Sequence, residues 1–85
     1  MAWKKVGKVT HYFVRISVAA VWLTGRLRVG EHIHILGHTS DFEQDVISME
    51  LEHQPIEAGE PGQEIGLLVV ERVRCGDTVY KVEEE

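Results

Sequence analysis

Apolar and polar residues alternate with a period of two along most of the chain, the pattern of β-strands that are buried on one face only. The longest regular stretch is 44–53, in which Ile47, Met49 and Leu51 point to one face and polar residues to the other. No stretch shows the 3.6-residue period of an amphipathic helix. We therefore predict an all-β chain, whose other strands are residues 6–13, 14–23, 32–35, 65–70 and 78–82.

Glycine marks two turns of similar sequence. Val29-Gly30-Glu31 precedes the predicted strand at 32–35, and Cys75-Gly76-Asp77 precedes the one at 78–82. Gly30 and Gly76 are expected to adopt a positive φ, which glycine reaches without steric cost. Glu31 and Asp77 are expected to accept backbone N–H bonds within the turn. These four residues are thus predicted to be structural, at two comparable corners of the fold.

The spacing of the strands predicts the architecture. Six or seven short strands with turns every eight to twelve residues are typical of a small, closed antiparallel β-barrel. Residues 55–62 include two prolines and two glycines and are expected to form a loop. Residues 1–85 are predicted to be a single domain, whose acidic end at 83–85 is expected to be disordered.

Composition excludes several classes of protein. Apolar residues make up 44% of the chain, enough for a globular core. The longest strictly apolar run, Val18–Leu23, is far shorter than the roughly 20 residues that cross a bilayer, so no membrane is expected as a partner. Cys75 is the single cysteine, which excludes an internal disulfide and favours a reducing compartment. We therefore expect a cytoplasmic protein.

Charge divides the chain, whose formal net charge is −5 at pH 7. Residues 31–85 hold all fourteen acidic residues, whereas residues 1–30 hold no acid and six basic residues, Lys4, Lys5, Lys8, Arg15, Arg26 and Arg28. One interpretation is a basic stripe, interleaved with aromatic residues, that follows an RNA backbone. The other is a set of basic strands that form salt bridges with acidic neighbours.

Histidine and cysteine raise the question of metal binding and catalysis. His32-x-His34 and the nearby His38 are weak candidates for a zinc site, but their spacing fits the polar face of a strand equally well, so no metal is expected. Cys75 has no histidine placed beside it by the sequence and is expected to be a structural thiol. With no paired acid and base either, the chain is predicted not to be an enzyme and to need no cofactor.

Several motifs resemble the second, β-barrel domain of translational GTPases of the elongation-factor-Tu type. They are Gly7-Lys8-Val9, Gly25-x-Leu27-x-x-Gly30-Glu31-x-Ile33-x-Ile35-x-Gly37, Val46-x-Ser48-Met49 and Ile56-Glu57-x-Gly59-x-x-Gly62-x-x-Ile65-Gly66-Leu67. Segments 5–13, 33–42 and 73–82 are more similar still to stand-alone translation elongation factor-like proteins. The resemblance covers nearly the whole chain and implies a barrel of the domain II type.

In that family the barrel helps to hold the 3′ end of a charged tRNA, and the resemblance implies that the corresponding pocket residues are Glu50, His53 and Glu64. The chain has no Gly-x4-Gly-Lys-Ser/Thr loop, so neither nucleotide binding nor GTPase chemistry is expected. The resemblance therefore implies a non-catalytic binding module related to translation, which recognises tRNA, rRNA or a ribosome-associated factor. The alternative is a protein-interaction subunit that lends a β-barrel to a larger enzyme complex.

Overall fold

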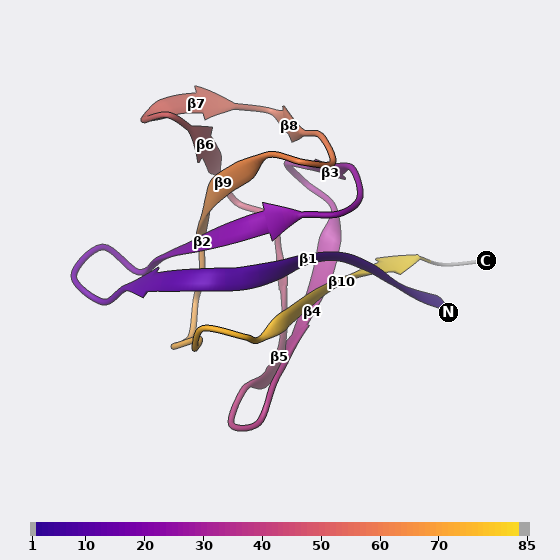
Figure 1. Cartoon of the computed structure of the whole chain (residues 1–85). Coiled ribbons are helices and arrows are strands. Elements are labelled where there is room, and N and C mark those ends of the chain that lie inside the picture. Colours follow the sequence, from indigo (N-terminus) through magenta and orange to yellow (C-terminus); the bar gives the residue numbers. More distant parts are fainter. Residues whose placement is uncertain (1, 84–85) are drawn as a thin grey trace.

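The computed structural model describes residues 2–83, which form ten β-strands and no helix (Figure 1). No helix in this range is therefore long and apolar enough to cross a membrane. The predicted all-β class is confirmed. The strands are β1 (Ala2–Phe13), β2 (Val18–Leu23), β3 (Leu27–Arg28), β4 (His32–Leu36), β5 (Asp41–Asp45), β6 (Met49–Leu51), β7 (Gln54–Ile56), β8 (Ala58–Gly59), β9 (Glu64–Leu68) and β10 (Thr78–Glu83).

Eight strands form one antiparallel sheet in the order β5-β4-β10-β1-β2-β9-β6-β7, and β3 pairs with β8 in a two-stranded sheet. The longest strand, β1, lies between β10 and β2 (Figure 1). Its pairing shifts register between Lys5 and Gly7 and again between Val9 and His11. Because β-bulges bend a strand and re-aim its side chains, these two shifts help the sheet to curl around one core.

The sheet is not closed into the predicted barrel of six or seven strands. Its end strands are β5 and β7, and no strand pairing among residues 2–83 joins them. A side chain of the end strand β5 instead makes hydrogen bonds to another part of the sheet. Gln44 of β5 donates from Nε2 to the Leu68 carbonyl (2.9 Å) and accepts the Val70 N–H at Oε1 (2.8 Å). Side-chain hydrogen bonds thus connect β5 to the segment around the end of β9.

The regular stretch at 44–53 is not one strand, as its pattern predicts, because β5 and β6 are separated by residues 46–48. Val46 is buried at this corner and donates its N–H to the Glu31 carbonyl (2.8 Å). Ile47 is 53% exposed rather than buried with its neighbours. The chain changes from pairing with β4 to pairing with β9 here, while the alternation of residue types continues through the corner.

One apolar cluster fills the space enclosed by the two sheets. Ile33 and Ile35 are fully buried, as the alternation at 32–35 predicts. Leu23 joins the sheets, because its side chain packs directly on Gly59 of β8, where no Cβ intervenes. The other core residues are Val6, Val9, Ala19, Val21, Leu27, Phe42, Val46, Met49, Ile65, Leu67, Val69, Val73 and Val79.

The two glycine turns are built alike. The φ angle is 94° at Gly30 and 98° at Gly76. In each turn the following acid, Glu31 or Asp77, accepts the backbone N–H of the residue three positions earlier, at 2.6 Å in the first turn and 2.9 Å in the second. Each acid also donates its own N–H to the carbonyl of that earlier residue. The same hydrogen-bonded turn therefore leads into β4 and into β10.

The ends of the described chain lie side by side, because Ala2 of β1 pairs with Glu83 of β10 (Figure 1). Glu83 is the last residue of β10. The rest of the acidic tail predicted to be disordered, residues 84–85, lies outside the described residues.

Candidate functional site

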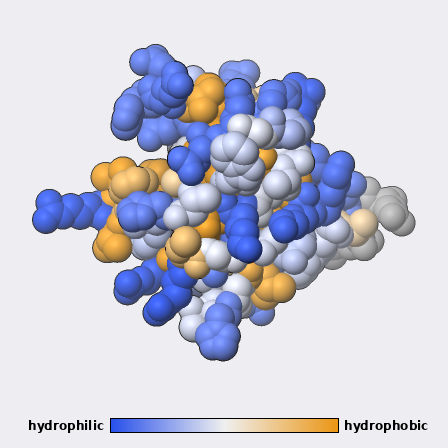
Figure 2. Space-filling model, viewed as in Figure 1, coloured by the Kyte–Doolittle hydropathy of each residue, from blue (hydrophilic) through white to orange (hydrophobic). Residues whose placement is uncertain are grey.

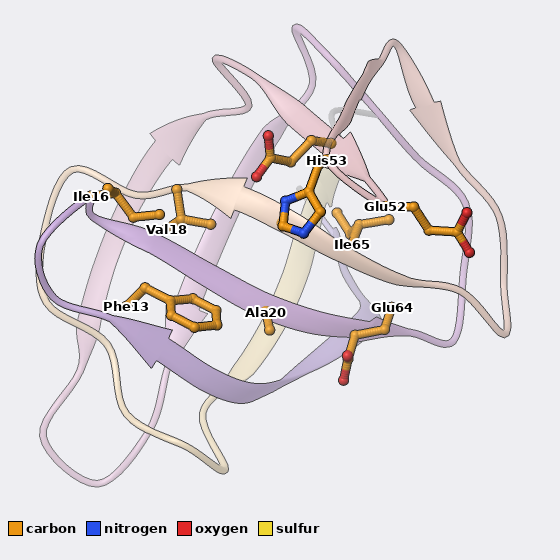
Figure 3. A pocket seen from close by; sticks show the side chains of 10 residues that line it. Phe13, Ile16, Val18, Ala20, Glu52, His53, Glu64 and Ile65 are labelled. Atoms are coloured by element: carbon orange, nitrogen blue, oxygen red, sulfur yellow. The ribbon is translucent and has the colours of Figure 1, made fainter.

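A groove of about 260 Å³ crosses the face of β1, β2, β9 and β6 that points away from the core (Figure 3). Its walls come from the β1–β2 hairpin on one side and the β6–β7 hairpin on the other. The lining residues are Phe13, Ile16, Val18, Ala20, Glu50, Glu52, His53, Glu64, Ile65 and Gly66.

The groove exists because small residues meet in the middle of this face. Ala20 of β2 pairs with Gly66 of β9, and Gly66 pairs with Glu50 of β6. A Cβ placed on Gly66 would lie only 3.0 Å from Glu50 Cγ and 3.3 Å from Val18 Cγ1. The missing side chain at Gly66 therefore lets Glu50 lie close over the sheet and leaves a hollow between the two hairpins.

One end of the groove is apolar. Phe13 and Ile16, at the tip of the β1–β2 hairpin, are 46% and 59% exposed, and Val18 lies beside them (Figure 3). Hydrophobic side chains gather at this end of the molecule, as Figure 2 shows, whereas hydrophilic ones cover much of the remaining face. An exposed cluster of large apolar side chains on a small domain is typical of a binding surface.

Acidic side chains line the rest of the groove. Glu64 of β9 and Glu52 of the β6–β7 turn lie toward the end away from Phe13 (Figure 3). The Glu64 carboxylate accepts a hydrogen bond from the Thr10 hydroxyl (2.8 Å). Thr10 occupies the second register shift of β1, so the bulge aims this hydroxyl across β2 toward Glu64. The position of Glu64 in β9 is thus fixed by a residue of β1, on the far side of β2.

The β6–β7 hairpin holds two groove residues in an uncommon backbone conformation. Its two-residue loop consists of Glu52 (φ 51°) and His53 (φ 65°), flanked by the pair Leu51 and Gln54. Positive φ at both loop residues is the geometry of a type I′ turn, which fits the twist of a hairpin but is costly for residues other than glycine, asparagine and aspartate. The turn directs the His53 imidazole over the groove (Figure 3).

The structure brings Glu50, His53 and Glu64 together, since all three line this groove. Sequence reasoning missed the apolar wall of Phe13 and Ile16, because the alternation at 14–18 predicts a strand, whereas residues 14–17 form the turn of the β1–β2 hairpin.

The basic residues of the N-terminal third are dispersed. Lys4, Lys5 and Lys8 lie along β1, Arg15 lies at the hairpin tip, and Arg28 lies in β3. None of them lines the groove. Their sequence neighbour Arg26 forms an ion pair with Glu60 (3.3 Å).

His32 and His34 alternate with acids of β5 to form a row on the outer face of β4. His32 lies between Asp45 (Nδ1–Oδ1, 2.8 Å) and Glu43 (Nε2–Oε2, 3.2 Å). His34 lies between Glu43 (3.3 Å) and Asp41, and the Trp3 ring stacks on it at 4.2 Å. Across residues 2–83, no three His, Cys, Asp or Glu side chains are placed to hold a metal ion. His38, the third residue considered for metal, is exposed in the β4–β5 turn.

The row makes the stability of the fold depend on pH. Hydrogen bonds to Asp45 and then Glu43 raise the pKa of His32 above 6.5, and hydrogen bonds from His32 and then His34 lower the pKa of Glu43 below 4.5. The contribution of His32 to the stability of the fold is complete below pH 6.5, and it is lost as the pH rises through the pKa of His32 in the folded state. The Glu43 contribution is complete above pH 4.5 and is lost as the pH falls.

We therefore expect His32→Gln to lower the melting temperature most between pH 4.5 and 6.5, by roughly 1–5 °C, and hardly at all near pH 9. Thermal unfolding followed by circular dichroism across this pH range measures the difference. His38→Gln serves as the control, because His38 is exposed and contacts none of the row. A constant difference between wild type and His32→Gln from pH 5 to pH 9 would contradict the prediction.

In architecture, the chain is similar to an all-β domain found at the C-terminal end of a larger enzyme. The C-terminal domain of a Geobacillus thermoleovorans protein described as a U32 peptidase superposes with a TM-score of 0.88, over 94% of this chain and 93% of that one, at 19% identity. The selenomethionine variant of the same domain superposes with a TM-score of 0.85, over 89% of this chain and 96% of that one. At this identity the likeness establishes the fold alone.

In sequence, the chain is similar to proteins named as proteases. An uncharacterized protease of Methanocaldococcus jannaschii is 32% identical over 81 residues, which is 94% of this chain and 20% of the relative. A collagenase of Porphyromonas gingivalis is 37% identical over 78 residues, which is 89% of this chain and 22% of the relative. The chain thus spans about one fifth of the length of the curated relatives it matches. The sequence matches no protein-family model.

These relatives overturn the resemblance to translation elongation factors. The predicted binding module for tRNA, rRNA or a ribosome-associated factor is therefore wrong, and the alternative of an interaction subunit is no better supported. The expectation that the chain is not an enzyme is also wrong, because its relatives are named as a protease and a collagenase. The glycine turns and alternating strands misled the functional prediction, because they specify a β-fold that proteins of many functions share. The cytoplasmic location stays a prediction.

Proposed function

We propose that the chain acts in proteolysis of the U32 peptidase type and that its groove binds the polypeptide substrate. The observation that carries this proposal is the match over 94% and 89% of the chain to a protease and a collagenase. The groove adds a place where a polypeptide can bind, with an apolar end at Phe13 and Ile16 and polar side chains along its length.

The shape of the groove suits an extended chain. Ligand sites are concave, largely apolar, and carry a few polar groups that fix orientation. Here Ala20 and Gly66 keep the floor low, while Glu50 and His53 supply hydrogen-bonding groups at its side. A peptide strand lying along the floor would place its side chains alternately toward the floor and toward solvent.

Gelatin is a suitable first probe, because one relative is named as a collagenase. We expect the chain to bind immobilised gelatin in a surface plasmon resonance measurement. The double variant Phe13→Ser, Ile16→Ser is expected to weaken binding about thirtyfold, since each side chain can contribute roughly 1 kcal/mol when a ligand covers it.

A matched control separates loss of the groove from loss of surface apolarity. Ile47 and Val70 are 53% and 57% exposed, like the groove pair, but do not line the groove. The double variant Ile47→Ser, Val70→Ser should bind gelatin as the wild type does. Absence of wild-type binding, or equal weakening by both double variants, would refute the proposed role of the groove.

A further inference from the structure

The groove carries an excess of negative charge. Three of its lining residues are carboxylates, Glu50, Glu52 and Glu64, and its lining includes no lysine or arginine. Within residues 2–83, none of these carboxylates forms an ion pair. Since the hydroxyl of Thr10 is neutral, its hydrogen bond to Glu64 leaves that charge uncompensated. A ligand that brings positive charge would be complementary to this surface.

The apolar and acidic parts of the groove adjoin each other. Phe13, Ile16 and Val18 occupy one end, Glu50 lies over Gly66 of the floor, and Glu64 and Glu52 lie toward the other end (Figure 3). A lysine side chain has the matching composition, because its aliphatic stem packs on apolar surface while its ammonium group stays near acidic or aqueous groups. An arginine side chain can do the same and can bind a carboxylate with two parallel hydrogen bonds.

We propose that the groove docks an extended peptide segment that carries a lysine or arginine two residues away from an apolar residue, so that both side chains face the floor. The apolar side chain lies against Phe13 and Ile16, and the cationic group lies among Glu50 and Glu64. This specificity rests on the peptide-binding role proposed above and defines the class of substrate sequence that the groove selects.

The backbone around the groove supports a preformed site. Three residues other than glycine have positive φ among those described: Ser17 (56°), Glu52 and His53. Glu52 and His53 line the groove, and Ser17 lies between the lining residues Ile16 and Val18. Residues held in such conformations cost on the order of 1 kcal/mol or more each, and they cluster at binding sites where the surrounding structure fixes them. A peptide would therefore meet walls that are already in place.

Two blocked ten-residue peptides test this charge preference. Both consist of glycine, serine and proline around a central segment, which is Leu-Ser-Lys in one peptide and Leu-Ser-Gln in the other. Each is titrated into the isotope-labelled 85-residue chain, and amide shifts of Ala20 and Gly66 report occupation of the groove. We expect the Leu-Ser-Lys peptide to bind about tenfold more tightly, since two carboxylates near one cation in a water-exposed groove lower the Kd by about a factor of ten.

Charge-neutral variants complete the test. Glu50→Gln with Glu64→Gln should abolish the difference between the two peptides, whereas Glu57→Gln with Glu71→Gln, both exposed and outside the groove, should preserve it. Equal binding of both peptides at the groove of the wild type would overturn the charge preference and leave peptide binding intact. Absence of shifts with either peptide would overturn both proposals.

Discussion

Leu23→Ala is expected to lower the free energy of unfolding by about 2–5 kcal/mol, which is a large part of the stability of a domain this small. Leu23 is fully buried. Its side chain packs on Gly59. Its backbone makes two hydrogen bonds to the β8–β9 connection: the Leu23 N–H donates to the Gln63 carbonyl (2.8 Å), and the Leu23 carbonyl accepts the Gly62 N–H (2.9 Å). Truncation would leave a cavity that these fixed backbone contacts prevent from collapsing.

Urea denaturation measures the change in the free energy of unfolding. In thermal unfolding, the melting temperature of the variant should be lower by roughly 10–25 °C. Leu36→Ala is the matched control, because Leu36 is 37% exposed and its loss opens no cavity. We expect the control to cost less than about 1 kcal/mol. A cost for Leu23→Ala as small as that of the control would show that the contact between the two sheets is not part of the stabilising core.

Gly37→Ala is expected to destabilise the fold by about 2–4 kcal/mol, because a new methyl group there would overlap the Asp77 side chain. The added Cβ would lie 2.5 Å from Asp77 Cγ. Asp77 is only 4% exposed, and its carboxylate accepts the Arg74 N–H in the turn before β10. Moving the carboxylate would break this bond and leave a backbone N–H without its partner.

A double-mutant cycle isolates this contact. In the background of Asp77→Ala, which removes the carboxylate, Gly37→Ala should cost less than about 1 kcal/mol. Chemical denaturation of the four proteins gives the coupling energy. If Gly37→Ala costs the same with and without the Asp77 carboxylate, the penalty comes from the backbone at Gly37 and not from overlap with Asp77.

The all-β class could be predicted from the sequence because burial on one face leaves a period of two. Ile33 and Ile35 follow this rule, and they are fully buried. The same rule fails at 46–48, where the chain turns a corner without any change in pattern. Alternation reports which residues face inward, but it does not report which strand each segment pairs with, and barrel closure depends on that pairing.

The candidate site could be predicted only in part. Glu50 and Glu64 meet because β6 and β9 pair in a register that places Glu50 opposite Gly66, two residues beyond Glu64. The pattern of residues alone does not show this register, and the two glutamates were named only through the resemblance to a translation-factor barrel. Phe13 reaches the same groove through the reversal of the β1–β2 hairpin, a turn that contains neither glycine nor proline and whose alternating residues predict a strand. Function was the least accessible from the sequence, because the pattern of a small β-fold is shared by proteins of many functions.

The pairing of Ala2 with Glu83 has a consequence for handling the domain. Both ends of the described chain leave from one corner, whereas Phe13 lies at the opposite end of the twelve-residue strand β1, in a molecule whose longest extent is 34 Å. An affinity tag, a fluorophore or a further polypeptide attached at either end would be anchored far from the apolar end of the groove. The domain can thus be tethered by this corner while the hairpin tip and the apolar end of the groove stay accessible.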